Sequence, residues 1–172
     1  CELAEETRKY KKNRLARHRR YFKIAGITVQ VESDLDFDNI AFKDALCSFA
    51  VDGPGDDNVT FRHSFEFPEL EGKDLGDELY NRAPWSISRK ENTWFYRCFS
   101  AGGQGVGLCR LAVFSADHSH AMIYSPPADA ELVQQKGWPS LSLFTTDQIW
   151  LIPLLAERNA ILLHSAAAVI NG

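Results

Sequence analysis

The 172-residue chain is 45% hydrophobic and 12% aromatic, which excludes a disordered protein and predicts one folded domain. Its formal charge of -4 hides an asymmetry, because residues 1–20 carry eight Lys and Arg against three Glu, whereas residues 21–172 carry eleven basic and twenty acidic side chains. This acidic body argues against nucleic-acid binding, which needs a basic surface along the phosphates, except through the N-terminal segment.

A basic segment opens the chain. Three Glu precede a run of Lys and Arg from Arg8 to Arg20, and few apolar residues interrupt it. Acidic residues near the start and basic residues near the end favour a solvated helix. We therefore predict a basic helical extension at 1–20 and a single β-rich domain at 21–172. The extension could also hold nucleic acid, an acidic partner or anionic lipid through screened charge attraction.

Short runs that alternate apolar with polar residues predict strands. In the run 22–33, Ile27, Val29 and Val31 alternate with polar residues, which is typical of a strand with one buried face. Turn-forming residues and acidic stretches separate the further predicted strands, which are 42–51, 58–67, 85–88, 93–100, 108–115 and 121–124.

The connector Gly102–Gly107 is rich in glycine and has the composition of a phosphate-binding loop. Such a loop needs a strand before it and a helix after it, so that the helix N-terminus faces the phosphate. A strand follows here instead. We interpret the segment as a hairpin connection, with ligand contact as the alternative.

One main helix is predicted at about 145–158. Thr145 or Thr146 is suited to cap its start, and Asn159 ends it. Pro153 lies inside this segment and is expected to kink the helix or to mark a later start.

The run 161–170 is almost continuously apolar and precedes Asn171 and Gly172, which predicts a buried strand that enters a tight turn. An apolar strand at a surface needs a partner, so a homo-oligomer through this edge is expected where nothing else covers it. The predicted fold class is therefore α+β: a β-rich body of mostly antiparallel strands, one main helix and the basic helical extension.

The segment from Gln148 to Gly172 resembles the stretch just before the phosphate-binding loop of HPr kinase/phosphorylases and their relatives with the phosphoenolpyruvate-carboxykinase-like fold. His164 and Gly172 carry the resemblance, because they are separated by a small, apolar run. In that family this pattern is a strand, a turn with Gly and a second strand that leads to the P-loop. The resemblance implies a G-x-x-x-x-G-K-[ST] loop about ten residues beyond Gly172, and thus an N-terminal part of a longer protein.

No Walker-type loop occurs within the 172 residues. Since the family's catalytic residues lie after that loop, the resemblance implies a non-catalytic segment with no catalytic, cofactor-binding or metal-binding residue of its own. It implies that the segment regulates the kinase or shapes its substrate cleft. For the intact protein it implies a bacterial serine/threonine-type phosphotransferase with a downstream P-loop domain, ATP, Mg and a protein substrate, and it places His164 and Gly172 near the nucleotide.

A second hypothesis is a self-contained β-rich module that binds a small ligand or a peptide without phosphoryl transfer, and it predicts that the gene ends near Gly172. A small enzyme is the third. His164 beside Ser165 could serve as a base, but no acidic residue that would orient it is evident in the sequence.

Two histidines have the spacing of metal ligands. His118 and His120 would point the same way on a strand, with Asp117 beside them, and could share a metal ion. No third ligand follows at a suitable distance, so polar residues in an exposed turn are the simpler interpretation. Asp34, Asp36 and Asp38 alternate as in a calcium loop, but the glycine and closing Glu of such a loop are absent, and we predict a turn.

The four cysteines form no C-x-x-C pair, which favours reduced thiols in a cytoplasmic protein. Cys98 and Cys109 lie on consecutive predicted strands, either as packing thiols or as a redox pair. No run of about 18 apolar residues and no signal peptide occurs, so the sequence predicts no membrane contact through a spanning helix.

Overall fold

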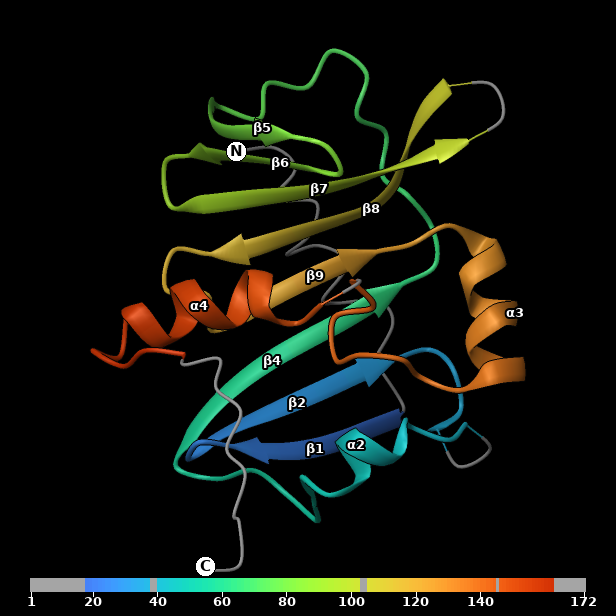
Figure 1. Cartoon of the computed structure of the whole chain (residues 1–172), viewed down its shortest axis with the longest axis vertical. Coiled ribbons are helices and arrows are strands. Elements are labelled where there is room, and N and C mark those ends of the chain that lie inside the picture. Colours follow the sequence, from blue (N-terminus) through green and yellow to red (C-terminus); the bar gives the residue numbers. More distant parts are fainter. Residues whose placement is uncertain (1–17, 38–39, 103–104, 145, 163–172) are drawn as a thin grey trace, which may run out of the picture.

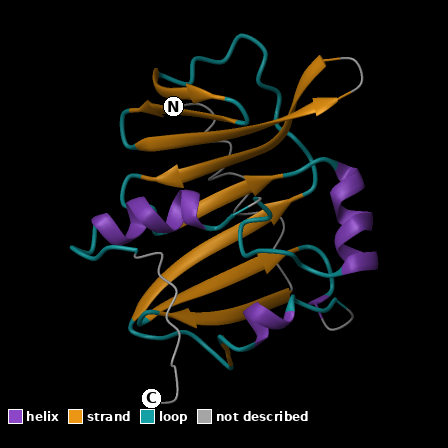
Figure 2. Ribbon diagram, viewed as in Figure 1, coloured by secondary structure: helices purple, strands orange, loops and turns teal. Residues whose placement is uncertain are grey.

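The computed structural model describes residues 18–37, 40–102, 105–144 and 146–162, which form a mixed nine-stranded sheet with helices beside it (Figures 1 and 2). The strand order is β3-β1-β2-β4-β9-β8-β7-β6-β5. The strands are β1 His18–Ile24, β2 Ile27–Ser33, β3 Ala50–Val51, β4 Asp57–Ser64, β5 Asp77–Arg82, β6 Trp85–Lys90, β7 Thr93–Gly102, β8 Gly105–Ser115 and β9 His120–Tyr124. The helices are α2 Asp44–Cys47, α3 Pro127–Lys136 and α4 Gln148–Ala156. The predicted β-rich α+β class is confirmed.

Most neighbouring strands are antiparallel, as predicted, but two pairs are parallel. β2 pairs with β4, and β4 pairs with β9, in parallel register. A parallel pair needs a long crossover, and the segment 34–56 provides one between β2 and β4. As a consequence, β2, β4 and β9 all end on the same side of the sheet, beside α3 (Figure 1).

The larger core lies between one face of the sheet and α4. This helix crosses that face (Figure 1) and buries Trp150 and Leu154 completely. Trp150 packs edge-on against Phe61 of β4, with ring centroids 4.6 Å apart. At the other end of the same face, Trp138 is fully buried against Phe37 and further rings of this aromatic cluster.

Asp147 organises the entry into α4. Its carboxylate accepts hydrogen bonds from the backbone N–H groups of Leu141 and Ser142 and from the indole N–H of Trp150. The predicted main helix is confirmed with narrower bounds, but its N-cap is Asp147 and not the predicted Thr145 or Thr146. Thr146 still contributes, because its hydroxyl accepts from the N–H of Gln148 at 3.2 Å.

One predicted element is wrong, and two elements were not predicted. The predicted strand 42–51 contains the short helix α2 and only the two residues of β3. The prolines after β9 begin a helix, because Pro127 takes its first turn, where a missing N–H costs nothing. β5 was not predicted, since all six of its side chains are exposed and show no buried face.

The predictions for the two ends of the chain can be compared with the structure only in part. Residues 18–20 of the predicted helical extension belong to β1, while 1–17 lie outside the described residues. Ile161 and Leu162 are not in a strand, so the predicted strand 161–170 is wrong at its start. Its remaining residues lie outside the described part, as do His164 and Gly172.

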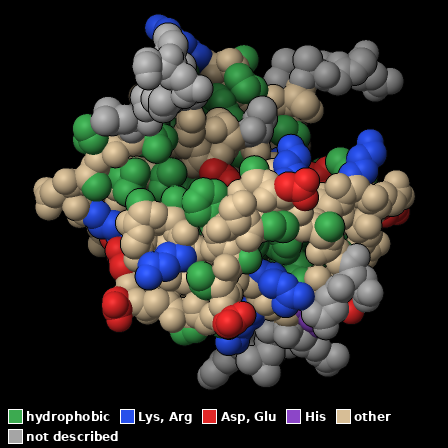
Figure 3. Space-filling model, turned by 60° about the horizontal axis from the view of Figure 1, so that its bottom comes forward, with side chains coloured by type: hydrophobic (Ala, Val, Ile, Leu, Met, Phe, Trp, Pro, Cys, Tyr) green, Lys and Arg blue, Asp and Glu red, His purple; other side chains and the backbone are tan. Residues whose placement is uncertain are grey.

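The two edge strands are unlike. β3 is only two residues long, whereas β5 exposes six residues, including Leu79 and Tyr80. A register shift between Glu78 and Tyr80 interrupts the pairing of β5 with β6, and such irregularities protect an edge against further pairing. Charges of both signs are interspersed among apolar side chains on the face shown in Figure 3.

Candidate functional site

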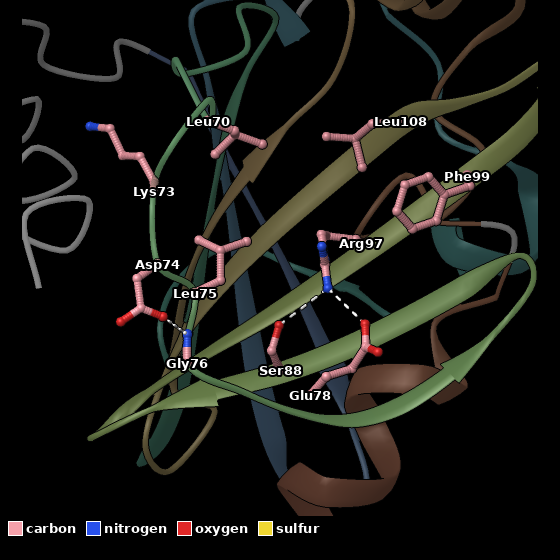
Figure 4. A pocket seen from close by; sticks show the side chains of 10 residues that line it. All are labelled: Leu70, Lys73, Asp74, Leu75, Gly76, Glu78, Ser88, Arg97, Phe99 and Leu108. Atoms are coloured by element: carbon pink, nitrogen blue, oxygen red, sulfur yellow. Dashed lines mark hydrogen bonds and ion pairs between the residues drawn. The ribbon is translucent and has the colours of Figure 1, made fainter.

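A second, smaller apolar cluster lies on the sheet face opposite α4. Its buried members are Phe95, Leu111, Val113, Met122 and Tyr124, from β7, β8 and β9. Phe67, Leu70 and Leu75 of the connection between β4 and β5 pack over it. This connection does not close the face completely, and a pocket of about 540 Å³ remains between it and the strands β5 to β8 (Figure 4).

The pocket has apolar walls and a polar floor. Leu70 and Leu75 form one wall, and Phe99 and Leu108 form the other (Figure 4). The guanidinium group of Arg97 lies between these walls. A ligand in this position would therefore meet hydrocarbon on two sides and a cation on the third.

Neighbouring strands hold Arg97 in place. One terminal nitrogen donates to the Ser86 hydroxyl at 2.6 Å, to Glu78 at 3.2 Å and to Ser88 at 3.5 Å. The register explains this meeting, because Ser86 of β6 lies opposite Arg97, and Glu78 of β5 lies opposite Ser88. Side chains that share a sheet face at such positions are close enough to bond.

The charges around the pocket balance. Hydrogen bonds from Ser86 and Asn81, and the charge of Arg97, lower the pKa of Glu78, which is therefore an anion at neutral pH. Lys73 and Asp74 add one charge of each sign to the lining. The pocket is thus amphipathic and close to neutral.

One polar atom of the floor lacks a partner. The Nε–H of Arg97 is buried and makes no hydrogen bond to any described residue. A buried donor without an acceptor costs free energy.

Another charged cluster on this face has all its members paired. Glu32 is 2% exposed and accepts two bonds from Arg62, at 2.5 and 2.9 Å. Arg19 lies 3.3 Å away and Gln30 donates at 2.5 Å. Because each group has its partner, the cluster fixes the pairing of β1, β2 and β4 and offers no open ligand position.

The structure separates the two histidines that the sequence suggested as metal ligands. His118 is 1% exposed, and its Nε2 lies 2.9 Å from the hydroxyl of Tyr96. His120 is exposed and lies 2.7 Å from the Ser119 hydroxyl. The predicted turn at 117–120 is confirmed, but His118 is packed against aromatic rings instead of lying on the surface. Among the described residues, no group of three or more His, Cys, Asp or Glu side chains could hold a metal ion.

Burial dominates the titration of this pair. It lowers the pKa of His118 to about 4 and raises that of Tyr96 above its usual value. Both groups are neutral at physiological pH, and the hydrogen bond between them is structural.

Cys98 and Cys109 meet across the hairpin of β7 and β8. The thiol of Cys109 donates to the carbonyl of Cys98 at 3.2 Å, and both thiols are free. Burial raises the pKa of Cys98 to about 12, which leaves an unreactive thiol. Cys98 belongs to the main core, so the packing role is the one the structure supports.

The remaining predicted sites are simple structural elements or lie outside the description. The glycine-rich connector joins β7 to β8, as predicted, although 103–104 are not described. Asp34 and Asp36 lie in the turn after β2, and Asp36 is 3.4 Å from His18. Asp38 lies outside the described residues.

The sequence prediction missed Arg97 and its partners. A signal was present, because Ser86 and Ser88 alternate with Trp85 and Ile87, which is typical of a strand with one polar face. That alternation does not show which charged residue faces the two serines.

Comparison with protein-family models, with curated proteins and with solved structures found no match. Within the part of the chain that the structure describes, none of the helices has the length and apolar character needed to cross a membrane.

Proposed function

We propose that this chain is the non-catalytic, β-rich part of an HPr-kinase-like, ATP-dependent protein kinase. The proposal rests on the resemblance of Gln148–Gly172 to the segment before the phosphate-binding loop of that family. In it, the sheet shapes the cleft for a protein substrate in the cytoplasm. A P-loop domain of the same chain supplies the catalytic residues and binds ATP and Mg.

Exposed apolar side chains on and after α4 are the observation that supports this proposal. The helix is an integral part of the domain, because Trp150 and Leu154 are buried in its core. On its outer side Ile152 is 55% exposed, and beyond the helix Ile161 is 77% and Leu162 38% exposed. Exposed apolar groups of this kind favour a covering partner, and the P-loop domain is the partner that the resemblance implies.

The native protein provides the first test. Its intact mass and the sequence of its transcript give the residues after Gly172, where we expect a G-x-x-x-x-G-K-[ST] loop within about twenty residues. Replacement of the loop Lys by Met should abolish Mg-ATP binding. A native chain without such a loop contradicts the proposal.

The domain contact has its own test in the same protein. Ile152→Lys with Ile161→Lys should expose the junction between the domains and speed up its cleavage in limited proteolysis. Leu132→Lys is the matched control, because Leu132 is 47% exposed on α3. Equal cleavage rates for the double variant and the control would show that α4 does not contact the P-loop domain.

A second candidate function is ligand binding by the sheet itself, and the pocket of Figure 4 favours it. The neutral fluorophore N-phenyl-1-naphthylamine suits its apolar walls. We expect its fluorescence to rise on binding and the affinity to fall in the Phe99→Ala variant, with Ile152→Ala on α4, at the other face of the sheet, as the control. An unchanged affinity in the Phe99 variant removes this candidate.

A further inference from the structure

A second pocket lies where the parallel strands end. The segment after β2 and the helix α3 after β9 meet there, and residues 139–143 close the space between them. The pocket has a volume of about 240 Å³. Its walls are mainly apolar and come from Leu132, Val133, Pro139 and Leu143. In open sheets with parallel strands, ligands commonly bind beyond the carboxyl ends of these strands.

The charged groups around this pocket do not balance. Lys43, Arg110 and Lys136 contribute to its lining against the single carboxylate of Asp129. Asp129 is already paired, because it accepts a hydrogen bond from Arg110. Within the described ranges, neither Lys43 nor Lys136 forms an ion pair. Two cations therefore stay uncompensated at the edge of an apolar space.

Backbone hydrogen bonds hold these two lysines near each other. The N–H of Trp138 donates to the carbonyl of Ala41 at 2.7 Å, and the N–H of Lys43 donates to the carbonyl of Trp138 at 3.1 Å. Trp138 itself is fully buried. The segments that carry the two lysines are thus joined at one buried residue of the core, and both lysines are exposed.

The floor of the pocket contains a strained residue. Leu143 has a φ of +58°, a left-handed conformation that is uncommon for a residue with a side chain. Its carbonyl is held by a hydrogen bond from Arg110, whose Nε also donates to the Ser125 hydroxyl at 3.0 Å. Strained residues held by surrounding bonds occur preferentially at ligand sites.

We propose that this pocket binds a small anion with an apolar body, that is, an aromatic or branched carboxylate. Lys43 and Lys136 favour a ligand with a negative charge, and the apolar walls disfavour a bare inorganic anion. The volume lies below the range of pockets for drug-sized ligands and excludes a nucleotide. The proposal depends on neither candidate function above, because it uses different residues.

Benzoate and its neutral isostere benzamide are the probes for the first experiment. We expect benzoate to shift the backbone amide resonances of Val133, Gly137 and Leu143 in ¹⁵N-labelled protein, with a dissociation constant in the millimolar range for so small a ligand. Benzamide should bind several-fold more weakly. Raising the ionic strength from about 0.02 M to about 0.3 M should remove most of this difference, because salt screens exposed charges. Equal affinity for the two probes, no shifts, or shifts confined to other residues would overturn the proposal.

Variants of the two lysines provide the second experiment. Lys43→Gln with Lys136→Gln should weaken benzoate binding about fivefold, as expected for two exposed charge contacts, and leave benzamide binding unchanged. Lys23→Gln with Arg82→Gln changes the net charge equally at exposed positions that line neither pocket and is the control. If both double variants lose affinity for benzoate equally, only the overall charge attracts the anion, and the pocket is not its site.

Discussion

Two buried histidines predict that the domain loses stability between pH 7 and pH 5. His63 of β4 is 3% exposed, and its Nε2 lies 2.9 Å from the carbonyl oxygen of Leu141. Its ring packs edge-on against Trp138 with centroids 4.9 Å apart. Burial lowers the pKa of His63 to about 3 and that of His118 to about 4. Both side chains are therefore neutral in the folded state at pH 5, whereas in the unfolded chain they take up protons below about pH 6.5.

The sign and size follow from proton linkage. Between the folded and unfolded pKa values the unfolded state binds more protons, so the free energy of unfolding falls as the pH falls. At pH 5, which is about 1.5 units below the unfolded pKa, each histidine lowers the free energy of unfolding by about 2 kcal/mol relative to pH 7. The two histidines together lower the free energy of unfolding by about 4 kcal/mol, which is a large share of the about 5–15 kcal/mol of a typical domain.

The carboxylate of Asp57 does not cause this change. The hydrogen bond with Arg158 lowers the pKa of Asp57, so its contribution is present above the unfolded value near 3.8 and is lost only as the pH falls further. Between pH 7 and pH 5 this group stays ionised in both states. Asp57 therefore does not contribute to the loss of stability in this interval.

Urea unfolding followed by tryptophan fluorescence measures this loss. The variant His63→Phe keeps a ring against Trp138 but leaves the carbonyl of Leu141 without its donor, so it should be less stable at pH 7. Its further loss on going to pH 5 should be smaller than that of the wild type by about 2 kcal/mol. His120→Gln, at an exposed position, is the control and should show the wild-type loss. An equal loss in the wild type and the His63 variant would refute the reasoning.

Three further predictions concern stability, each measured by urea unfolding at pH 7. Leu154→Ala should cost about 2–5 kcal/mol because it empties a fully buried position in the core, whereas Ile152→Ala on the exposed side of the same helix should stay within about 0.5 kcal/mol. Glu32→Gln should cost toward the lower end of about 3–5 kcal/mol, since it leaves Arg62 without its anion while that side chain is still 26% exposed. Gly137→Ala should cost at least about 1 kcal/mol, because φ is +84° and the new Cβ would lie 2.6 Å from a backbone oxygen. An unchanged stability of the Leu154, Glu32 or Gly137 variant would contradict the packing described.

The strands with one apolar face could be predicted because an apolar face leaves a pattern of period two. In β2 the predicted apolar face is correct, since Val29 and Val31 are buried toward α4, but the prediction of a single buried face is wrong, because Thr28 and Glu32 on the opposite face are buried as well. β5 carries no such pattern, since its residues are all exposed. The helix α3 could not be predicted either, because Val133 is its only buried residue and a helix with one buried side chain shows no apolar stripe.

The candidate pockets could not be predicted from the sequence. Arg97 meets Glu78 only because β5 pairs with β6 after the long connection that crosses the sheet, and no local pattern specifies that pairing. Lys43 and Lys136 are brought together by the bridge between Phe42 and Trp138, which depends on the whole aromatic cluster. Sites built from residues distant in sequence need the strand order, and the strand order is decided by tertiary packing.

The parallel strands explain why the anion pocket lies beside α3. An entirely antiparallel sheet would send successive connections to opposite ends, whereas β2, β4 and β9 all run toward the same end. The segments that follow β2 and β9 therefore converge, and one carries Lys43 while the other carries Lys136. Both lysines are exposed and lie on connections instead of strands. Replacing them changes the charge of the pocket without disturbing the core, so a change in benzoate affinity can be attributed to the pocket itself.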